Sequence, residues 1–250
     1  MTRPLWPCYV INLADNTVRM DNVRAQLDAQ GIAFERVEAV NGWALSDEEI
    51  AQVYDPVANA KRGKQDLVPA EMGCYLSHIH AWRTIAAGPA DGGVILEDDF
   101  QAVESLSDVL GALCASPDRA WDIAKLFSIN ADPKIIASSP LTEGYVLATP
   151  LRVPSTTLGY AITRQAAQVL LERSVPFFRP IDEDHKFLWE HGLRVSLVIP
   201  SPVVVGEQEA VTGTIGAARR KRSKGRALRK LRYQLGYQLR IRLHRLGRRG

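Results

Sequence analysis

The chain has 250 residues, 46% of them hydrophobic and 24% charged, which is typical of a globular protein with a sizeable core. Its formal net charge of +3 hides an asymmetry, because residues 219–250 hold 14 of the 31 Lys and Arg and no acidic residue. The remaining body has 17 basic and 28 acidic residues and does not attract nucleic acid by its own field, whereas the basic tail attracts phosphate groups.

The cysteines and the apolar runs indicate the compartment. Cys8, Cys74 and Cys114 are odd in number and scattered, which predicts neither a disulfide framework nor a zinc knuckle and favours a reducing environment. No apolar segment near the N-terminus suits a signal peptide, and no later run approaches the roughly 18 apolar residues of a membrane span. We therefore expect a cytoplasmic protein.

Strand and helix patterns alternate from the N-terminus. The predicted elements of the first part are a strand over 5–13, a helix over 16–30 that ends at Gly31, a strand over 32–40, a helix capped by Ser46, and an irregular loop over 55–68. Those of the second part are a helix over 69–87, a short strand that ends before three acidic residues, strands over 121–127, 144–153 and 195–199, and a helix over 164–173.

This alternation predicts an α/β fold with a mostly parallel, Rossmann-like sheet covered by helices on both faces. In such sheets ligands bind at the carboxyl ends of the strands. We expect one domain over residues 1–210 and a separate basic tail over 211–250.

An acidic cluster, Glu97, Asp98 and Asp99, follows the short apolar strand. Three adjacent carboxylates repel one another unless a cation or protonation relieves them. Mg²⁺ and Mn²⁺ prefer oxygen ligands and take the rest of their shell from water and substrate phosphates. Because the side chains of alternate residues at a strand end point to the same side, Glu97 and Asp99 could converge on one ion. The alternative is a solvated turn.

Five segments in order resemble glycosyltransferase family 25, whose members include lipopolysaccharide-biosynthesis galactosyltransferases. They are VINL at 10–13 with Arg19, EMGCYLSH at 71–78 with Trp82, ILEDD at 95–99, LGYAI at 158–162, and PID at 180–182. The resemblance implies a GT-A fold, a UDP-sugar donor such as UDP-galactose, a divalent cation (Mn²⁺ or Mg²⁺), and inversion at the anomeric carbon.

The two acidic sites that an inverting transfer needs can be assigned to residues. A carboxylate takes the proton of the acceptor hydroxyl, while a metal neutralises the departing diphosphate. We assign Asp99 as a metal ligand, Glu97 as a second contact to the metal, its water or the donor, and Asp98 as a supporting residue. Asp182 is the preferred base and Asp184 the second choice, although Asp182 could instead cap a helix that begins near residue 183.

Further site residues follow from the resemblance, each with a structural alternative. Predicted substrate contacts are Asn12 and Arg19 for the nucleotide, Ser77 and His78 for the diphosphate or acceptor, and Gly159 and Tyr160 for a sugar. His78 could instead bind the metal, and His185 and His191 are possible extra metal ligands. The alternatives are a solvated charge at Arg19, a structural helix histidine at 78 and a strand-to-helix turn at 159–160. Glu71 is expected only to stabilise the N-terminus of its helix.

The basic tail contains a row of leucines at helical spacing. Its members are Leu228, Leu231, Leu235, Leu239, Leu243 and Leu246. Such a basic amphipathic helix predicts peripheral attachment to anionic lipid on the inner face of the cytoplasmic membrane, where a glycolipid acceptor would be presented. The alternatives are a helix packed on the body, a dimer contact and a disordered tail.

Three other functions compete with a transferase. A non-catalytic GT-A-fold protein that binds a glycan or a partner would be expected to lose an acidic position, and all three are present. Phosphatases of the haloacid dehalogenase type carry their paired aspartates after the first strand, which this chain does not. An RNA-associated role is suggested only by the tail, because the body lacks a basic, aromatic-rich face.

Overall fold

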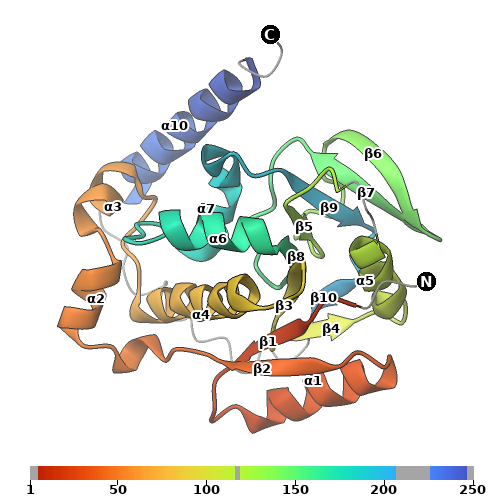
Figure 1. The fold of residues 1–250 in the computed structure, drawn as a ribbon. Coiled ribbons are helices and arrows are strands. Elements are labelled where there is room, and N and C mark those ends of the chain that lie inside the picture. Colours follow the sequence, from red (N-terminus) through yellow and green to blue (C-terminus); the bar gives the residue numbers. More distant parts are fainter. Residues whose placement is uncertain (1–4, 116–118, 207–225, 247–250) are drawn as a thin grey trace.

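An eight-stranded sheet forms the centre of the protein (Figure 1). The computed structural model describes residues 5–115, 119–206 and 226–246. The strands lie in the spatial order β2-β1-β3-β8-β5-β9-β7-β6. Their bounds are β1 Cys8–Asn12, β2 Phe34–Glu38, β3 Gly92–Glu97, β5 Ile123–Lys125, β6 Ile135–Thr142, β7 Tyr145–Pro150, β8 Gly159–Thr163 and β9 Val195–Ile199. A second, two-stranded sheet pairs β4 Phe100–Ala102 with β10 Val203–Val205.

The large sheet is mixed. Strands β2, β1 and β3 pair in parallel, as do β5 and β9, whereas β7 and β8 run against their neighbours. The predicted α/β class is confirmed, and six of the eight strands share one direction. The two reversed strands interrupt the parallel order on both sides of the β5–β9 pair.

Helices cover both faces of the sheet. Helices α4 (Pro69–Ala87) and α6 (Arg164–Arg173) pack on one face, and α1 (Thr17–Ala29) and α5 (Leu106–Ala115) pack on the other. Because successive side chains of a strand point to opposite faces, Ile95 of β3 joins the first core, while Val94 and Leu96 join the second. The sequence predicted this two-layer covering.

Several predicted elements are confirmed, and others needed the structure. The helices over 69–87 and 164–173 have the predicted bounds, and α2 (Asp47–Val53) begins after Ser46 with a capping box. The loop predicted over 55–68 is wrong, because it contains α3 (Pro56–Arg62), whose first turn is capped by the Asp55 carboxylate accepting from the Ala58 N–H at 2.8 Å. The remaining short helices are η1 Gly42–Ala44, α7 Ile181–Asp184 and η2 His185–His191.

The C-terminal helix α10 (Arg226–Leu246) packs on the body beside α3 and α7 (Figure 1). Its buried residues are Tyr233, Tyr237 and Ile241, which recur every four positions and surround Phe187 together with Trp189. At 100° per residue the predicted leucine row lies on the opposite side of the helix, and Leu228 to Leu243 of that row are 52–77% exposed. The helix therefore has two apolar faces, one of them covered by the body.

Parts of the predicted tail lie outside the described residues, namely the boundary at 210/211, the basic residues 219–225 and Arg248. Within the described part of the chain, no helix has the combination of length and apolar character that crossing a membrane requires.

Candidate active site

Most of the predicted site residues lie at one edge of the sheet. Parallel pairing places the end of β1, at Asn12, beside the end of β3, at Glu97. Strand β8 runs against β3 and begins at Gly159, which faces Leu96. The acidic turn therefore meets the 156–159 segment at the carboxyl edge, where the sequence predicted a ligand site.

Asp98 is held by its neighbours. One carboxylate oxygen accepts a hydrogen bond from the Asn12 side chain at 2.7 Å, and the other pairs with the Arg19 guanidinium at 2.6 Å. Asn12 in turn accepts from Arg36 at 3.0 Å. Asn12 and Arg19, predicted to contact the nucleotide, thus fix the acidic turn in this state, and Asp98 already has a cation.

Asp99 has a different environment although it is the next residue. Its Oδ1 is buried and accepts no hydrogen bond from the residues that the structure describes, while Oδ2 is 3.9 Å from Arg19, a weaker pairing than that of Asp98. Burial and the charge of Glu97 raise the pKa of Asp99 to about 7 despite Arg19. A buried carboxylate oxygen without a partner, beside a second carboxylate, suits a hard divalent cation, so these residues fit Mn²⁺ or Mg²⁺.

Glu97 is positioned by two polar side chains. Its Oε1 lies 3.2 Å from His78 Nε2 and accepts a hydrogen bond from the Thr157 hydroxyl. Burial alone would raise the pKa of Glu97, but the bonds and charge of His78, the Thr157 hydroxyl and the Lys125 ammonium lower it below its usual range. Glu97 is therefore ionised under ordinary conditions and can contribute a charged oxygen.

His78 belongs to a buried polar network beneath Glu97. Its Nδ1 lies 2.9 Å from the Tyr160 hydroxyl, which also accepts from Trp82 Nε1 at 2.9 Å. Tyr160 is fully buried in β8, so it orients His78 and has no surface for stacking a sugar. The predicted sugar contact at Tyr160 is thus wrong for this state, because the ring is inside the core.

Lys125 is a buried cation that the sequence analysis did not identify. It ends β5, donates to the Thr156 carbonyl, and lies 2.6 Å from His185 Nδ1. Burial lowers the pKa of Lys125 to about 7, against the opposing charges of Glu97 and Asp182. Burial and then Lys125 lower the pKa of His185 far below its usual range. His185 is thus a neutral partner of Lys125, and His191 lies apart on the last turn of η2.

The two candidate bases differ in their contacts. Asp184 accepts from the Tyr75 hydroxyl at 2.6 Å and pairs with Arg179 at 2.7 Å, so it connects α7 to α4. Asp182 is half-buried, its Oδ1 accepts the N–H of Glu183 at 2.8 Å, and its charge acts on Lys125 and Cys74. The geometry therefore associates Asp182 with the network at the sheet edge and gives Asp184 a structural role.

Ser77 and Glu71 have structural roles. The Ser77 hydroxyl donates to the Gly73 carbonyl and accepts from the Val40 N–H at 2.8 Å, so it does not face the acidic turn. Glu71 accepts from the Val68 N–H at 2.8 Å, as expected for a residue in the first helical turn. Close to Ser77 along α4, Gly42 and Gly73 meet backbone to backbone, since a Cβ on Gly73 would lie 2.5 Å from the Gly42 nitrogen and 2.4 Å from the Val40 carbonyl oxygen.

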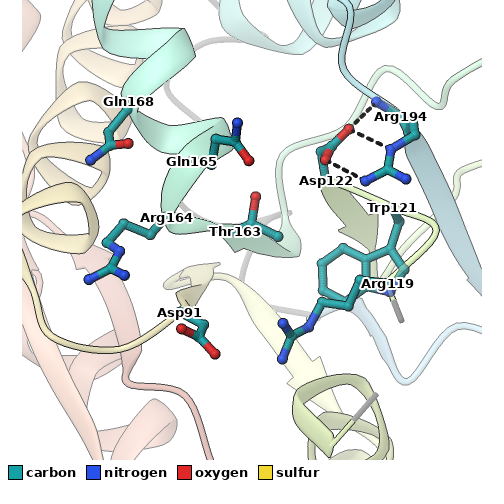
Figure 2. Close-up of a pocket in the computed structure, with 9 residues that line it drawn as sticks. All are labelled: Asp91, Arg119, Trp121, Asp122, Thr163, Arg164, Gln165, Gln168 and Arg194. Atoms are coloured by element: carbon teal, nitrogen blue, oxygen red, sulfur yellow. Dashed lines mark hydrogen bonds and ion pairs between the residues drawn. The ribbon is translucent and has the colours of Figure 1, made fainter. Parts of the chain in front are cut away.

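A surface hollow of about 700 Å³ lies at the opposite end of the sheet (Figure 2). Its lining includes Thr163 at the end of β8, Asp122 and Arg194. Figure 2 shows Asp122 and Arg194 joined in a bidentate ion pair. None of the predicted site residues lines this hollow. We assign no function to this hollow, because Asp122 and Arg194 in its lining already pair with each other.

Sequence reasoning missed three side chains at the candidate site: Cys74, Lys125 and Thr157. Lys125 gave little signal, because a lysine at the end of an apolar strand usually reaches solvent. Cys74 stands four residues before His78 on a predicted helix, and this spacing was available in the sequence.

Comparison with known proteins finds related sequences over most of the chain. The model of "Glycosyltransferase family 25 (LPS biosynthesis protein)" matches residues 6–184, which include β1, the acidic turn and α7. The chain is 26% identical over 186 residues to a glycosyltransferase 25 family member of Aedes aegypti, and the match covers 70% of this chain and 29% of that protein.

Two human relatives are similar to the same extent. Procollagen galactosyltransferase 2 is 27% identical over 187 residues, with 70% of this chain and 29% of the relative covered. Inactive glycosyltransferase 25 family member 3 is 28% identical over 186 residues, with 70% and 30% covered. The match spans less than a third of these relatives, and since the family model covers well over half of this chain, the chain belongs to glycosyltransferase family 25.

Proposed function

We propose that this chain is an inverting, metal-dependent glycosyltransferase of GT-A type that transfers a sugar, galactose, from its UDP conjugate to lipopolysaccharide or another surface glycan. The observation that carries the proposal is the environment of Asp99. An unpartnered buried oxygen and a raised pKa mark a carboxylate whose charge Arg19, 3.9 Å from the other oxygen, compensates only in part. A metal bound with a nucleotide diphosphate would supply that compensation.

The residues at the sheet edge have different proposed roles in metal binding and in positioning the metal ligands. Asp99 and Glu97 would hold the cation, which would neutralise charge on the departing nucleoside diphosphate. Asn12, Arg19 and Asp98 keep the turn that carries Asp99 in place. His78, Thr157 and Lys125 keep Glu97 oriented and ionised.

Asp182 is the proposed general base. In the transfer, the acceptor hydroxyl oxygen forms a bond to the anomeric carbon from the face opposite the leaving group, the bond to the diphosphate breaks, and Asp182 takes the hydroxyl proton. Its half-burial and its electrostatic influence on Lys125 and Cys74 support this role. Asp184 is the weaker candidate, because Tyr75 and Arg179 already occupy its oxygens.

The acceptor class is proposed from the family and from α10. The family model's description names lipopolysaccharide biosynthesis, whereas several relatives are named procollagen galactosyltransferases. On α10 the exposed row Leu228, Leu231, Leu235, Leu239 and Leu243 has the exposed Arg232 and Arg242 within its edges. An apolar row with arginines that can extend to lipid headgroups suits an anionic membrane on the cytoplasmic side, where lipid-linked acceptors are accessible. This favours a glycolipid acceptor over nucleic acid or a collagen-like chain.

A nucleotide-sugar panel tests the proposal. The purified chain is incubated with UDP-galactose, UDP-glucose and UDP-N-acetylglucosamine, with Mn²⁺ or with chelator, and release of UDP is measured with and without a lipopolysaccharide core acceptor. We expect UDP release from UDP-galactose that needs Mn²⁺ and increases with acceptor. Binding of the nucleotide without any turnover would favour the non-catalytic alternative. One human relative is named an inactive member of the family, so this alternative has a precedent.

A further inference from the structure

Cys74, His78 and Glu97 form a cluster of three metal-ligating side chains. Their ligand atoms, one from each residue, all lie within 4.8 Å of one another. Cys74 and His78 stand four residues apart on α4 and so project from one face of the helix, while Glu97 comes from the end of β3. Two rigid elements thus present sulfur, nitrogen and oxygen to one point.

We propose that this cluster is a second metal site, selective for Zn²⁺ or a similar borderline cation, that is distinct from the Mn²⁺ or Mg²⁺ site at Asp99 and shares Glu97 with it. Thiolate and imidazole ligands favour zinc, whereas Mg²⁺ and Mn²⁺ prefer oxygen ligands. Three protein ligands leave the fourth tetrahedral position to water, as in zinc sites that exchange ligands.

The distances are close to those of a zinc site. Bonds of about 2.0–2.3 Å to a tetrahedral ion place ligand atoms about 3.3–3.7 Å apart. His78 Nε2 and Glu97 Oε1 are already 3.2 Å apart. With all separations within 4.8 Å, the Cys74 sulfur needs to approach by about 1 Å, which a side-chain rotation supplies.

The surroundings also suit a cation. The carboxylates of Glu97, Asp182 and Asp99 act electrostatically on the Cys74 sulfur, and their negative field would attract a metal, which would displace the thiol proton. A coordinating His78 Nε2 needs its proton on Nδ1, where the Tyr160 hydroxyl lies 2.9 Å away and can accept it. His78 therefore has the outer hydrogen-bond partner that zinc-ligating histidines usually have.

Because Glu97 is shared, zinc at this cluster removes one ligand from the proposed catalytic metal. Zn²⁺ is thus expected to inhibit transfer without occupying Asp99. This consequence rests on the proposed function, whereas binding of zinc to the cluster does not.

Cobalt binding tests the site without substrate. Co²⁺ replaces Zn²⁺, and a thiolate ligand gives it a charge-transfer absorption in the near ultraviolet. We expect this absorption in the full-length wild type, in Asp99→Asn and in the control thiol variant Cys114→Ser, and its loss on addition of Zn²⁺. In Cys74→Ser and Cys74→Ala the absorption should vanish and Zn²⁺ affinity, measured by calorimetry, should fall on the order of 10²-fold or more. Circular dichroism checks that each variant is folded.

An absorption that is absent in the wild type, or that persists in a folded Cys74 variant, would overturn the site. In the Mn²⁺-supported assay, Zn²⁺ should inhibit the wild type at concentrations on the order of 10²-fold lower than Cys74→Ser. Equal inhibition of the two would overturn the inhibitory role. A protein that binds Co²⁺ through Cys74 but transfers no sugar would retain the zinc site and refute only the proposed function.

Discussion

A carboxylate at the acidic turn and one at the contact between α10 and the body have pKa values shifted in opposite directions. At the α10 contact, Glu183 meets Lys186 at 3.0 Å, Lys64 at 3.2 Å and the Tyr233 hydroxyl, so its pKa is lowered although burial acts against this. At the sheet edge, Asp99 is half-buried with one oxygen fully buried, and its pKa is raised. Side chains of the fold therefore compensate the charge of Glu183, whereas full compensation of the charge of Asp99 requires a bound ligand.

The largest expected effect comes from neutralising Asp99. Asp99→Asn replaces a charged metal ligand by an amide, and metal stabilisation of the leaving group is worth several kcal/mol, so transfer should fall on the order of 10³-fold or more. Steady-state rates at saturating donor with Mn²⁺ measure this. The matched variant Asp98→Asn should instead keep Mn²⁺ dependence but lower the free energy of unfolding by about 2–4 kcal/mol, because Arg19 loses its close partner. Full activity in Asp99→Asn contradicts the metal assignment.

The next largest effect distinguishes the two candidate bases. Asp182→Asn should lower the transfer rate on the order of 10²-fold while donor binding stays nearly unchanged, because proton removal is lost and the metal site is not. Asp184→Asn should mainly lower stability, since it weakens contacts to Tyr75 and Arg179. Rates and calorimetric donor affinities for both variants provide the measurement. If Asp182→Asn no longer binds the donor, Asp182 belongs to the donor site.

The pH dependence of metal binding follows from the raised pKa of Asp99. The ionised carboxylate is the ligand, so Mn²⁺ affinity should increase about tenfold per pH unit below a pKa of about 7 and level off above it. Folding raises this pKa above 3.8, so without metal the contribution of Asp99 to stability is greatest below pH 3.8 and decreases as the pH rises toward 7. Calorimetric Mn²⁺ titrations from pH 5.5 to about 8.5 test the first statement. A flat affinity profile would mean that Asp99 is not a ligand.

The smallest expected effect concerns the two faces of α10. The double variant Leu235→Ser, Leu239→Ser alters only the exposed row, so it should leave stability within about 0.5 kcal/mol and weaken binding to anionic vesicles about tenfold or more. Ile241→Ala changes the buried face and should do the reverse, with a loss of about 2 kcal/mol in stability and vesicle binding retained. Vesicle sedimentation at low salt and denaturant unfolding are the measurements. Equal sedimentation of wild type and double variant argues against membrane attachment.

The sequence predicted the fold where local signals agree with tertiary packing. Pro69 at the start and Gly88 at the end of α4 mark a helix whose buried face is continuous, and its bounds are confirmed. Helix α3 was missed because its polar and basic residues outweighed the Asp55-Pro56 start signal. Along α10 the predicted leucine row is exposed, whereas the buried face of Tyr233, Tyr237 and Ile241 was not identified from the sequence, although its spacing is equally regular.

The candidate site was predictable as a location and less so in its details. The strand that ends at Glu97 places the acidic turn at the carboxyl edge, which a sequence pattern reveals. Whether a carboxylate has a partner depends on contacts between residues far apart in the sequence, such as Arg19 and Asp98, which are 79 positions apart. The buried charge of Lys125 depends on β5 lying between β8 and β9, an order that no local pattern encodes.

The close approach of Gly42 and Gly73 limits how this protein can vary during evolution. Any side chain at Gly73 would press on the Val40 carbonyl at 2.4 Å, and one at Gly42 would overlap the Pro69 carbonyl. Relief requires α4 to shift, and α4 carries Cys74 and His78 on the turn that follows. Two positions that hold no functional group should therefore tolerate almost no substitution, and a random library selected for activity would recover glycine at both.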